Sequence, residues 1–437
     1  MMRIRTVLLV FVFPIAALYA AEPLLFDTAD HGEPGDKAPR IKAWKEVTLN
    51  PEYSGQWVVT GDVDCDGEAD IVSARNVDEN DVHFTSAAVA QRLDGSVIWR
   101  WGDPTIGRKE LHHDVACQIY DWNGDGKNEV IVLTNGFLVE LNGKTGKERR
   151  RFPIPPQASD CLVFANLSGN KHASDVLVKT RYSQIWAYNQ DGESLWTVEN
   201  PGQARTAHQP RPMDLDRDGR DEIFAGYAML NSDGSVRWRF ESQKIDENRG
   251  HLDCARILRH GKTPEEFRLA LTCCGANDVA LIDGTGKVIW EIAGHHFESI
   301  NIGRVFPDVP GPQILVDIDH RPRGESPIWV LSEKGDLLGQ IMADYCRHHT
   351  LVDWTGDGYQ EIVIADSRGV FDQEGQRIAT LEMDDPGKIL LDGDMTGDGV
   401  PDITLTTMEK VYVFRNEKGK KPKEPVSLGS GMNFTLY

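Results

Sequence analysis

The chain has 437 residues, of which 26% are charged, and its formal net charge is -21. Such an acidic balance argues against a nucleic-acid partner, because binding to phosphates requires a basic face. The length would ordinarily suggest two or three domains. Repeats run through nearly all of it, however, from about Trp57 to Arg415, so a single repeat array is expected.

Residues 1–21 have the pattern of a secretory signal. Arg3 and Arg5 precede an apolar run over residues 7–18 that ends in small residues. This run is too short to span a membrane, and no stop-transfer pattern follows it. We therefore expect an exported protein, extracellular or periplasmic, that is monomeric and has no transmembrane segment after the signal is removed.

An acidic turn with fixed spacing recurs five times along the chain. Oxygen-bearing side chains stand at its first, third and fifth positions, glycine follows at the sixth, and a carboxylate at the ninth leads into a strand-like run. The predicted metal ligands are Asp62, Asp64, Asp66 and Asp70; Asp121, Asn123, Asp125 and Glu129; Asp214, Asp216, Asp218 and Glu222; Asp353, Asp357 and Glu361; and Asp394, Asp398 and Asp402.

Oxygen ligands in a glycine-containing turn suit calcium, a hard cation. The turns lack the bidentate glutamate at position 12 that an EF-hand requires. We expect structural Ca²⁺ in at least two of them; the alternative is a set of turns rich in Asp, Asn and Gly that need no metal.

The period of the turns indicates the type of array. Counting a weaker copy at Asn166, successive turns are 41 to 59 residues apart, except that the 139 residues from Asp214 to Asp353 hold three periods of about 46. Strand-turn-strand remnants without metal ligands, at residues 257–271 and 302–315, fill that gap. Periods of roughly 40 to 50 with several short strands are typical of propeller blades.

A second signature, Asp-Gly before an apolar stretch ending in Trp, follows most acidic turns. It predicts a tight hairpin. The pairs are Asp94-Gly95 with Trp99, Asp191-Gly192 with Trp196, Asp233-Gly234 with Trp238, and Asp283-Gly284 with Trp290. Each repeat thus has four strands, and the tryptophans are expected to fill the space between neighbouring blades.

The predicted fold is an all-β, eight-bladed β-propeller of four-stranded antiparallel blades over residues 53–437, or seven-bladed if the terminal repeats share one blade. Ring closure requires an outer strand for the last blade. Residues 41–49, within an N-terminal segment at 22–52, or the tail at 433–437 could supply it. Cys117, Cys161 and Cys254 fall in predicted innermost strands, where a buried structural role is expected.

Histidines gather at the other end of the innermost strands. They are His112 and His113, His208, His251, His295 and His296, and His348 and His349. Because all inner strands of a propeller run the same way along the axis, their starts meet around one mouth of the central channel. Cations fall at the same strand starts: Arg205, Arg211, Arg249, Arg347 and Lys388.

A basic, imidazole-rich funnel in an acidic protein indicates an anionic small group or a sugar acid as partner. Converging neutral imidazoles could alternatively bind a transition metal. No carboxylate pair of the kind that glycosidases use is expected at this mouth.

The acidic turns and Asp-Gly hairpins resemble the FG-GAP or VCBS repeat class. Within that class, residues 111–126 and 208–219 resemble secreted polysaccharide lyases: rhamnogalacturonan lyase and the propeller lyases that cut beside glucuronate, such as ulvan and rhamnose-glucuronate lyases. The resemblance implies β-elimination on an acidic polysaccharide, in which the uronate carboxylate is neutralised, a base removes the C5 proton and an acid protonates the leaving oxygen.

This chemistry implies roles for the histidines and cations of the mouth, and calcium could also take a catalytic part. His113 is favoured first, because it stands beside His112 and Asp114 ahead of a complete acidic turn. The other implied catalytic residues are His208, His251, His296 and His349, and the implied substrate-binding residues are His112, Arg211, Arg347 and Lys388.

Two other functions fit parts of the pattern. A non-catalytic carbohydrate- or protein-binding FG-GAP propeller would use the same ring for recognition only. A quinoprotein-like oxidoreductase is suggested by Gly-x-x-x-Trp hairpins such as residues 286–290. No adjacent-cysteine site on a convincing axial loop is evident, although the neighbours Cys273 and Cys274 keep this alternative open.

Overall fold

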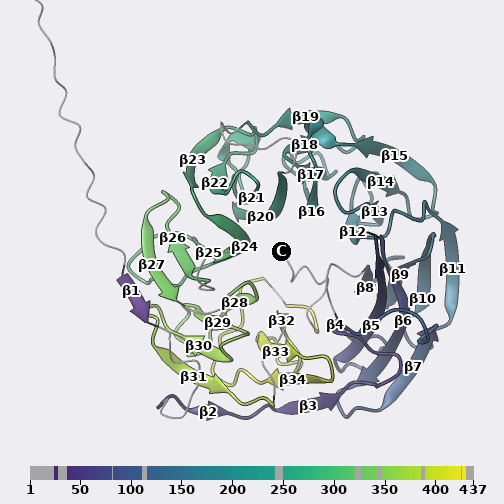
Figure 1. The fold of residues 1–437 in the computed structure, drawn as a ribbon, viewed down its shortest axis with the longest axis horizontal. Coiled ribbons are helices and arrows are strands. Elements are labelled where there is room, and N and C mark those ends of the chain that lie inside the picture. The colour runs from purple at the N-terminus through teal and green to yellow at the C-terminus, as the bar shows by residue number, and fades with distance from the viewer. Residues whose placement is uncertain are drawn as a thin grey trace, which may run out of the picture.

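The structure is a computed structural model, and it describes residues 24–27, 37–80, 82–110, 116–241, 250–319, 326–342, 346–384, 389–424 and 426–429. Eight separate β-sheets are arranged around a central axis (Figure 1). Within the described residues the only helical elements are two short 3-10 turns, η1 (Pro201–Gln203) and η2 (Pro264–Glu266). The prediction of an all-β, eight-bladed propeller is confirmed.

Each blade has its innermost strand first in sequence. Blade 1 is β4 (Trp57–Gly61), β5 (Asp70–Glu79), β6 (Val82–Arg92) and β7 (Val97–Gly102); blade 2 is β8 (Cys117–Tyr120), β9 (Glu129–Thr134), β10 (Phe137–Asn142) and β11 (Glu148–Pro153); blade 3 is β12 (Cys161–Ala165), β13 (Asp175–Lys179), β14 (Gln184–Tyr188) and β15 (Ser194–Glu199); blade 4 is β16 (Thr206–Met213), β17 (Glu222–Gly226), β18 (Ala228–Leu230) and β19 (Val236–Arg239).

The second half of the ring repeats this order. Blade 5 is β20 (His251–Arg259), β21 (Arg268–Cys274), β22 (Asp278–Ile282) and β23 (Val288–Ala293); blade 6 is β24 (His296–Gly303), β25 (Gln313–Asp319), β26 (Ile328–Leu331) and β27 (Leu337–Met342); blade 7 is β28 (His349–Val352), β29 (Glu361–Ile364), β30 (Gly369–Phe371) and β31 (Arg377–Leu381); blade 8 is β32 (Ile389–Gly393), β33 (Asp402–Thr406) and β34 (Lys410–Phe414).

The N-terminal segment runs along the outer edge of three successive blades. β1 (Leu24–Asp27) pairs in parallel with β27 of blade 6, and β2 (Arg40–Ile41) pairs in parallel with β31 of blade 7 (Figure 1). β3 (Lys45–Thr48) pairs antiparallel with β34 and supplies the fourth strand of blade 8. Strand pairing between the two ends of the array therefore closes the ring, and residues 433–437 lie outside the described part.

Antiparallel pairing divides the propeller into two faces. The acidic turns join each first strand to its second, and the Asp-Gly hairpins join the third to the fourth, so both lie on one face, called the turn face here. The opposite face, where the inner strands begin, is called the mouth face. Consequently the predicted calcium turns lie at the opposite ends of the inner strands from His208, His251, His296 and His349, the predicted catalytic histidines that the structure describes.

Burial on both sides explains the apolar sequence of the strands. All five residues of β12, Cys161–Ala165, are buried, as are all five of β13. Clusters of apolar side chains bridge successive blades; Trp57 and Val59 of blade 1, for example, pack with Cys117 and Ile119 of blade 2. The expected buried positions of the inner-strand cysteines are confirmed.

The hairpin tryptophans join each blade to the next, as predicted. Each indole Nε1 donates to a carbonyl in the next blade's hairpin. The pairs are Trp99 with Gly143 at 2.5 Å, Trp196 with Ser232 at 2.9 Å, Trp238 with Gly284 at 2.9 Å, and Trp290 with Glu333 at 2.9 Å.

Candidate functional site

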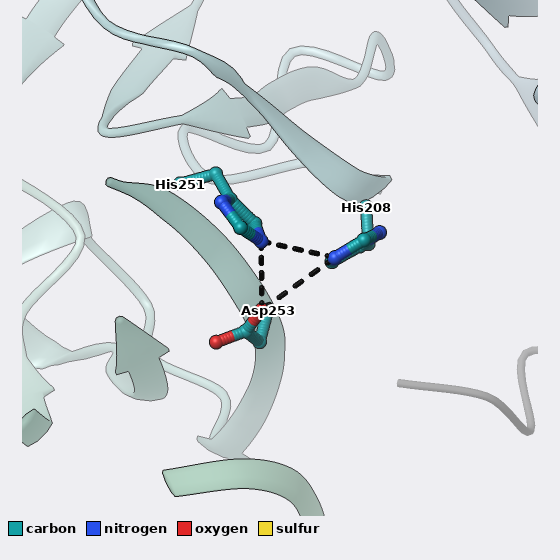
Figure 2. A group of neighbouring side chains, drawn as sticks. All are labelled: His208, His251 and Asp253. Atoms are coloured by element: carbon teal, nitrogen blue, oxygen red, sulfur yellow. Dashed lines mark hydrogen bonds and ion pairs between the residues drawn. The ribbon is translucent and has the colours of Figure 1, made fainter. Parts of the chain in front are cut away.

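Three buried side chains converge on the mouth face where blades 4 and 5 meet (Figure 2). The Nε2 atoms of His208 and His251 are 3.0 Å apart. Asp253 Oδ1 lies 3.1 Å from the His251 nitrogen and 3.6 Å from the His208 nitrogen. We call these three residues the mouth triad.

Strand geometry explains this convergence. His251 is the first residue of β20, and alternate residues of a strand project from the same face, so Asp253 returns to the side of His251. β16 and β20 are the inner strands of adjacent blades, and His208 lies near the start of β16. Residues 43 positions apart therefore meet at the rim of the channel.

Burial controls the charges of the mouth triad. Desolvation and the neighbouring His251 lower the pKa of His208 well below its usual value, so this imidazole is neutral at physiological pH. Desolvation and the nearby Glu298 raise the pKa of Asp253 well above that of an ordinary carboxyl. Asp253 Oδ2 is buried and has no hydrogen-bond partner within the described residues.

The three donor atoms of the mouth triad lie within 4.8 Å of one another, a spacing that suits a metal ion. Asp253 also belongs to a second such group, with Cys274 and His296. An ion there would take a carboxylate oxygen of the buried Asp253 and one ring nitrogen of each histidine as ligands. The residues present thus fit a divalent cation.

A second polar cluster continues around the mouth on blades 5, 6 and 7. His296 Nε2 lies 2.8 Å from Glu298 Oε1, and His296 Nδ1 lies 3.3 Å from Asn277 Oδ1. Arg347 Nη2 donates to Glu298 Oε1 and, at 2.9 Å, to Asp319 Oδ2. Burial alone would lower the pKa of His296, but the hydrogen bond and charge of Glu298 outweigh it and raise the pKa.

Carboxylates that were not among the predicted site residues also lie at the mouth. Asp253, Glu298, Asp317 and Asp319 all lie there, because each returns to the mouth two residues along a strand or lies at the end of the strand paired with it. The sequence carried a signal for two of them: His-x-Asp at residues 251–253 and His-x-Glu at residues 296–298.

Of the other residues predicted at the mouth, some lie there, one lies elsewhere on its strand, and some lie outside the described residues. His349 begins β28, and its Nε2 lies 3.7 Å from Asp317 Oδ1. Arg211 was expected at a strand start, but β16 begins at Thr206, so Arg211 lies mid-strand, where it donates to Gln209 Oε1 at 2.9 Å. His112, His113, Arg249 and Lys388 lie outside the described residues.

On the turn face, two of the five acidic turns bring three carboxylates together. In each, one oxygen per carboxylate lies within 4.8 Å of the others; the groups are Asp62, Asp64 and Asp66, and Asp214, Asp216 and Asp218. The other three turns have Asn123, Thr355 or Thr396 at the third position and so bring fewer charges.

The carboxylate at the ninth position of each acidic turn accepts a hydrogen bond from the backbone N–H of the turn's second residue. Asp70 accepts the N–H of Val63 at 3.1 Å, and Glu222 accepts that of Leu215 at 2.9 Å. Glu129, Glu361 and Asp402 make the same contact. Burial raises the pKa of Asp70 to about 7.

Two observations bear on cation binding by the acidic turns. Asp64 Oδ1 and Asp214 Oδ1 are buried and accept no hydrogen bond within the described residues, which leaves acceptor oxygens for an ion. Arginines already share other oxygens: Arg92 pairs with Asp64, and Arg237 lies 2.7 Å from Asp216. The turns thus fit Ca²⁺ and are also partly neutralised by the protein itself.

Sequence comparison relates the chain to two rhamnogalacturonan lyases. The rhamnogalacturonan endolyase YesW of Bacillus subtilis (strain 168) is 23% identical over 374 residues, covering 71% of this chain and 57% of that protein. The rhamnogalacturonan exolyase YesX of the same organism is 22% identical over 382 residues, covering 72% and 61%. The chain is a distant homologue of these lyases. It spans less than two thirds of the length of either.

Solved structures of such lyases share the fold. The YesW structure superposes with a TM-score of 0.59 at 18% identity, covering 88% of this chain and 77% of that one. The Bacillus licheniformis PL11 rhamnogalacturonan lyase gives 0.61 at 19%, covering 87% and 77%. The V. cholerae biofilm matrix protein Bap1 gives 0.59 at 11%, covering 91% and 94%. At these identities the likeness establishes the propeller alone, and no protein-family model matches the chain.

Proposed function

We propose that this protein is a secreted polysaccharide lyase that cleaves a uronate-containing polymer, of the rhamnogalacturonan type, by β-elimination on the mouth face. The observation that carries the proposal is the mouth triad, with His208 and His251 3.0 Å apart and beside Asp253. Distant homology to rhamnogalacturonan lyases supports the choice of reaction and polymer.

The mouth triad would hold a divalent cation, Ca²⁺ or a transition metal. When bound, that ion would neutralise the uronate carboxylate and make the C5 proton more acidic. The protein's part is to keep the His208 imidazole neutral, through its burial and the neighbouring His251, and to hold Asp253 on the same side of strand β20 as His251. All three side chains are buried, which strengthens the electrostatic interactions among them.

His296 is the proposed general acid. Both of its ring nitrogens face acceptor oxygens, of Glu298 and Asn277, and this environment favours the doubly protonated imidazolium. That proton can pass to the glycosidic oxygen as the C4–O bond breaks. The electron pair freed when the base removes the C5 proton forms the C4–C5 double bond. His113, outside the described residues, remains the proposed base.

Arg347 has a positioning role in this proposal. Glu298 and Asp319 already occupy its Nη2 group, so it orients Glu298 against His296. This assignment replaces the expected direct pairing of Arg347 with substrate.

The test is a screen of the purified protein on pectic, ulvan-type and gum-type polymers, followed by ultraviolet absorbance and product analysis. A lyase releases products ending in an unsaturated uronate. Saturated products would make the protein a hydrolase. Binding without new reducing ends would make it the non-catalytic propeller that its repeats also allow.

The part of the chain that the structure describes contains no helix with the length and hydropathy of a membrane span.

A further inference from the structure

A polar pocket opens beside the mouth triad, between blades 3 and 4. Its volume is about 650 Å³. It is formed by the β13–β14 turn, with Tyr182 and Ser183, and by the β15–β16 connection, with Glu199, Asn200, Gln203 and Arg205. Amide, hydroxyl, aromatic and guanidinium groups line it together. None of the predicted site residues belongs to this lining except Arg205, which the sequence placed only among the cations of the mouth.

Two arginines flank the tyrosine of the pocket, one of them, Arg205, in the pocket lining itself. The guanidinium carbons of Arg181 and Arg205 each lie 4.9 Å from the ring centroid of Tyr182. Within the described residues, no carboxylate lies within 4.0 Å of the Arg205 guanidinium. The pocket lining contains one acidic residue, Glu199. An arginine fork in this position can receive a carboxylate through two parallel hydrogen bonds.

The connection that carries Arg205 has an unusual backbone. Asn200, Gly202 and Gln203 all have positive φ, of 44°, 65° and 66°. For Asn200 and Gln203 this conformation is costly, and such residues collect at ligand sites held rigid by their surroundings. Asn200 N donates to Ser183 O at 2.7 Å, which fixes one wall of the pocket to the other.

The opposite wall is held from below by a buried ion pair. Lys179 and Asp160 are both 1% exposed and paired through Nζ and Oδ2. Lys179 Nζ also donates to the carbonyls of Thr180 and Arg181, at 2.9 and 2.8 Å. The turn that presents Tyr182 is therefore rigid before any ligand arrives.

Tyr182 connects this pocket to the mouth triad. Its ring centroid lies 4.8 Å from that of His251 and 5.6 Å from that of His208. Its carbonyl accepts the N–H of Thr206 at 3.0 Å, two residues before His208 on β16. A sugar ring in the pocket would thus adjoin one at the triad.

We propose that Arg205 and Tyr182 form a sugar-acid subsite, in which Arg205 binds the carboxylate of a uronate residue neighbouring the one that reacts. Asn200, Gln203 and Ser183 supply donors and acceptors for its hydroxyls, and Tyr182 provides an apolar edge against the ring. This inference rests on the proposed function for the class of polymer, while the site itself rests on the pocket.

The test compares binding of a galacturonate-rhamnose oligosaccharide with binding of its carboxyl-reduced derivative, by titration calorimetry, for the wild type, Arg205→Gln and Tyr182→Ala. Arg304→Gln is the matched control, because Arg304 also lies 4.9 Å from a tyrosine ring, that of Tyr359, but next to an acidic turn on the other face. Circular dichroism and melting curves confirm that each variant is folded.

We expect Arg205→Gln to weaken binding of the acidic oligosaccharide by about 10- to 100-fold, the value of a hydrogen-bonded charge, and to leave binding of the reduced one within about 2-fold. Arg304→Gln should change neither. Equal weakening for both oligosaccharides, an unchanged affinity in Arg205→Gln, or no wild-type binding would overturn the subsite. Arg205-dependent binding without any cleavage would uphold the subsite and refute the lyase, so the two failures are distinguishable.

Discussion

Gly286 lies against the indole of Trp238 so closely that a Cβ atom at residue 286 would stand 2.6 Å from Trp238 Cε3. Its φ of +86° is also one that only glycine adopts readily. The same packing of hairpin glycine on the preceding blade's ring recurs at Gly146, Gly234 and Gly335. Together with the indole hydrogen bonds, these contacts fit the hairpin of each of these blades against the tryptophan of the preceding blade.

Gly286→Ala should therefore destabilise the protein through both strain and overlap. Gly95→Ala is the matched control, since Gly95 occupies the same hairpin position with φ of +85°, and a methyl group there would meet none of the described residues within 4 Å. We expect Gly286→Ala to lower the free energy of unfolding by about 1 to 3 kcal/mol more than Gly95→Ala, the cost of overpacking. Equal losses in denaturant titrations would show that the indole contact contributes nothing.

Calcium removal should lower the melting temperature. An ion that binds only the folded state stabilises it by about 2.7 kcal/mol per site at 100 times its dissociation constant. Asp218→Ala, in one of the two turns with three carboxylates, should remove part of the calcium-dependent shift. Asp233→Ala, in the Asp-Gly hairpin of the same blade, should retain all of it. A melting curve that a chelator leaves unmoved, with no metal in elemental analysis, would make the turns metal-free.

The buried pair of Lys179 and Asp160 should give stability a defined pH dependence. Burial alone would raise the pKa of Asp160, but Lys179 and His83 outweigh it and lower the pKa. A carboxyl with a lowered folded-state pKa contributes stability above its unfolded pKa of about 3.9, and this contribution is lost as pH falls toward the folded pKa.

Lys179→Met should cost about 3 to 5 kcal/mol at neutral pH, because it leaves Asp160 buried without its cation. The pKa of Asp160 would then rise, so protonation on acidification would relieve the variant. We expect the difference in unfolding free energy between wild type and variant to shrink from pH 7 to pH 4. A difference that stays constant over this range would contradict an ionised Asp160.

His296→Gln should lower kcat by about 10² to 10⁴, the usual contribution of one general acid. Its effect on KM should be small, because the proton is transferred only as the bond breaks. His260→Gln, an exposed histidine that follows β20 on the turn face, is the control and should keep wild-type rates. Similar kinetics for both variants would remove His296 from the chemistry.

The repeat pattern predicted the blades because one local rule is used many times. The acidic turn and the Asp-Gly hairpin each mark a fixed strand junction, so their spacing gives the number of strands. Blade 1 departs from the period because β5 and β6 have 10 and 11 residues. This long hairpin lets His83 reach Asp160, at the start of blade 3, at 2.7 Å.

The sequence predicted the histidines of the site but not its carboxylates. Histidines at strand starts are visible in the sequence, but the carboxylates at the mouth depend on which strand face points inward and on where each strand begins. A register shift between Thr206 and Arg211 moved the start of β16 five residues earlier than the apolar pattern suggested. The Tyr182 pocket lies between the β13–β14 turn and the β15–β16 connection. These two segments are brought together by tertiary packing, so the sequence pattern did not predict the pocket.

Lyase activity at the mouth triad is tested by the rate at which ultraviolet absorbance appears when the protein is mixed with rhamnogalacturonan, for the wild type and for Asp253→Asn. We expect a rising absorbance from unsaturated uronate ends in the wild type and a loss of activity of about 10² or more in the variant, because the mouth triad loses its carboxylate ligand. Asp233→Asn, on the turn face, should match the wild type. Wild-type activity that survives intact in Asp253→Asn would place the chemistry elsewhere, and no activity in the wild type on any uronate polymer would contradict the assignment as a lyase.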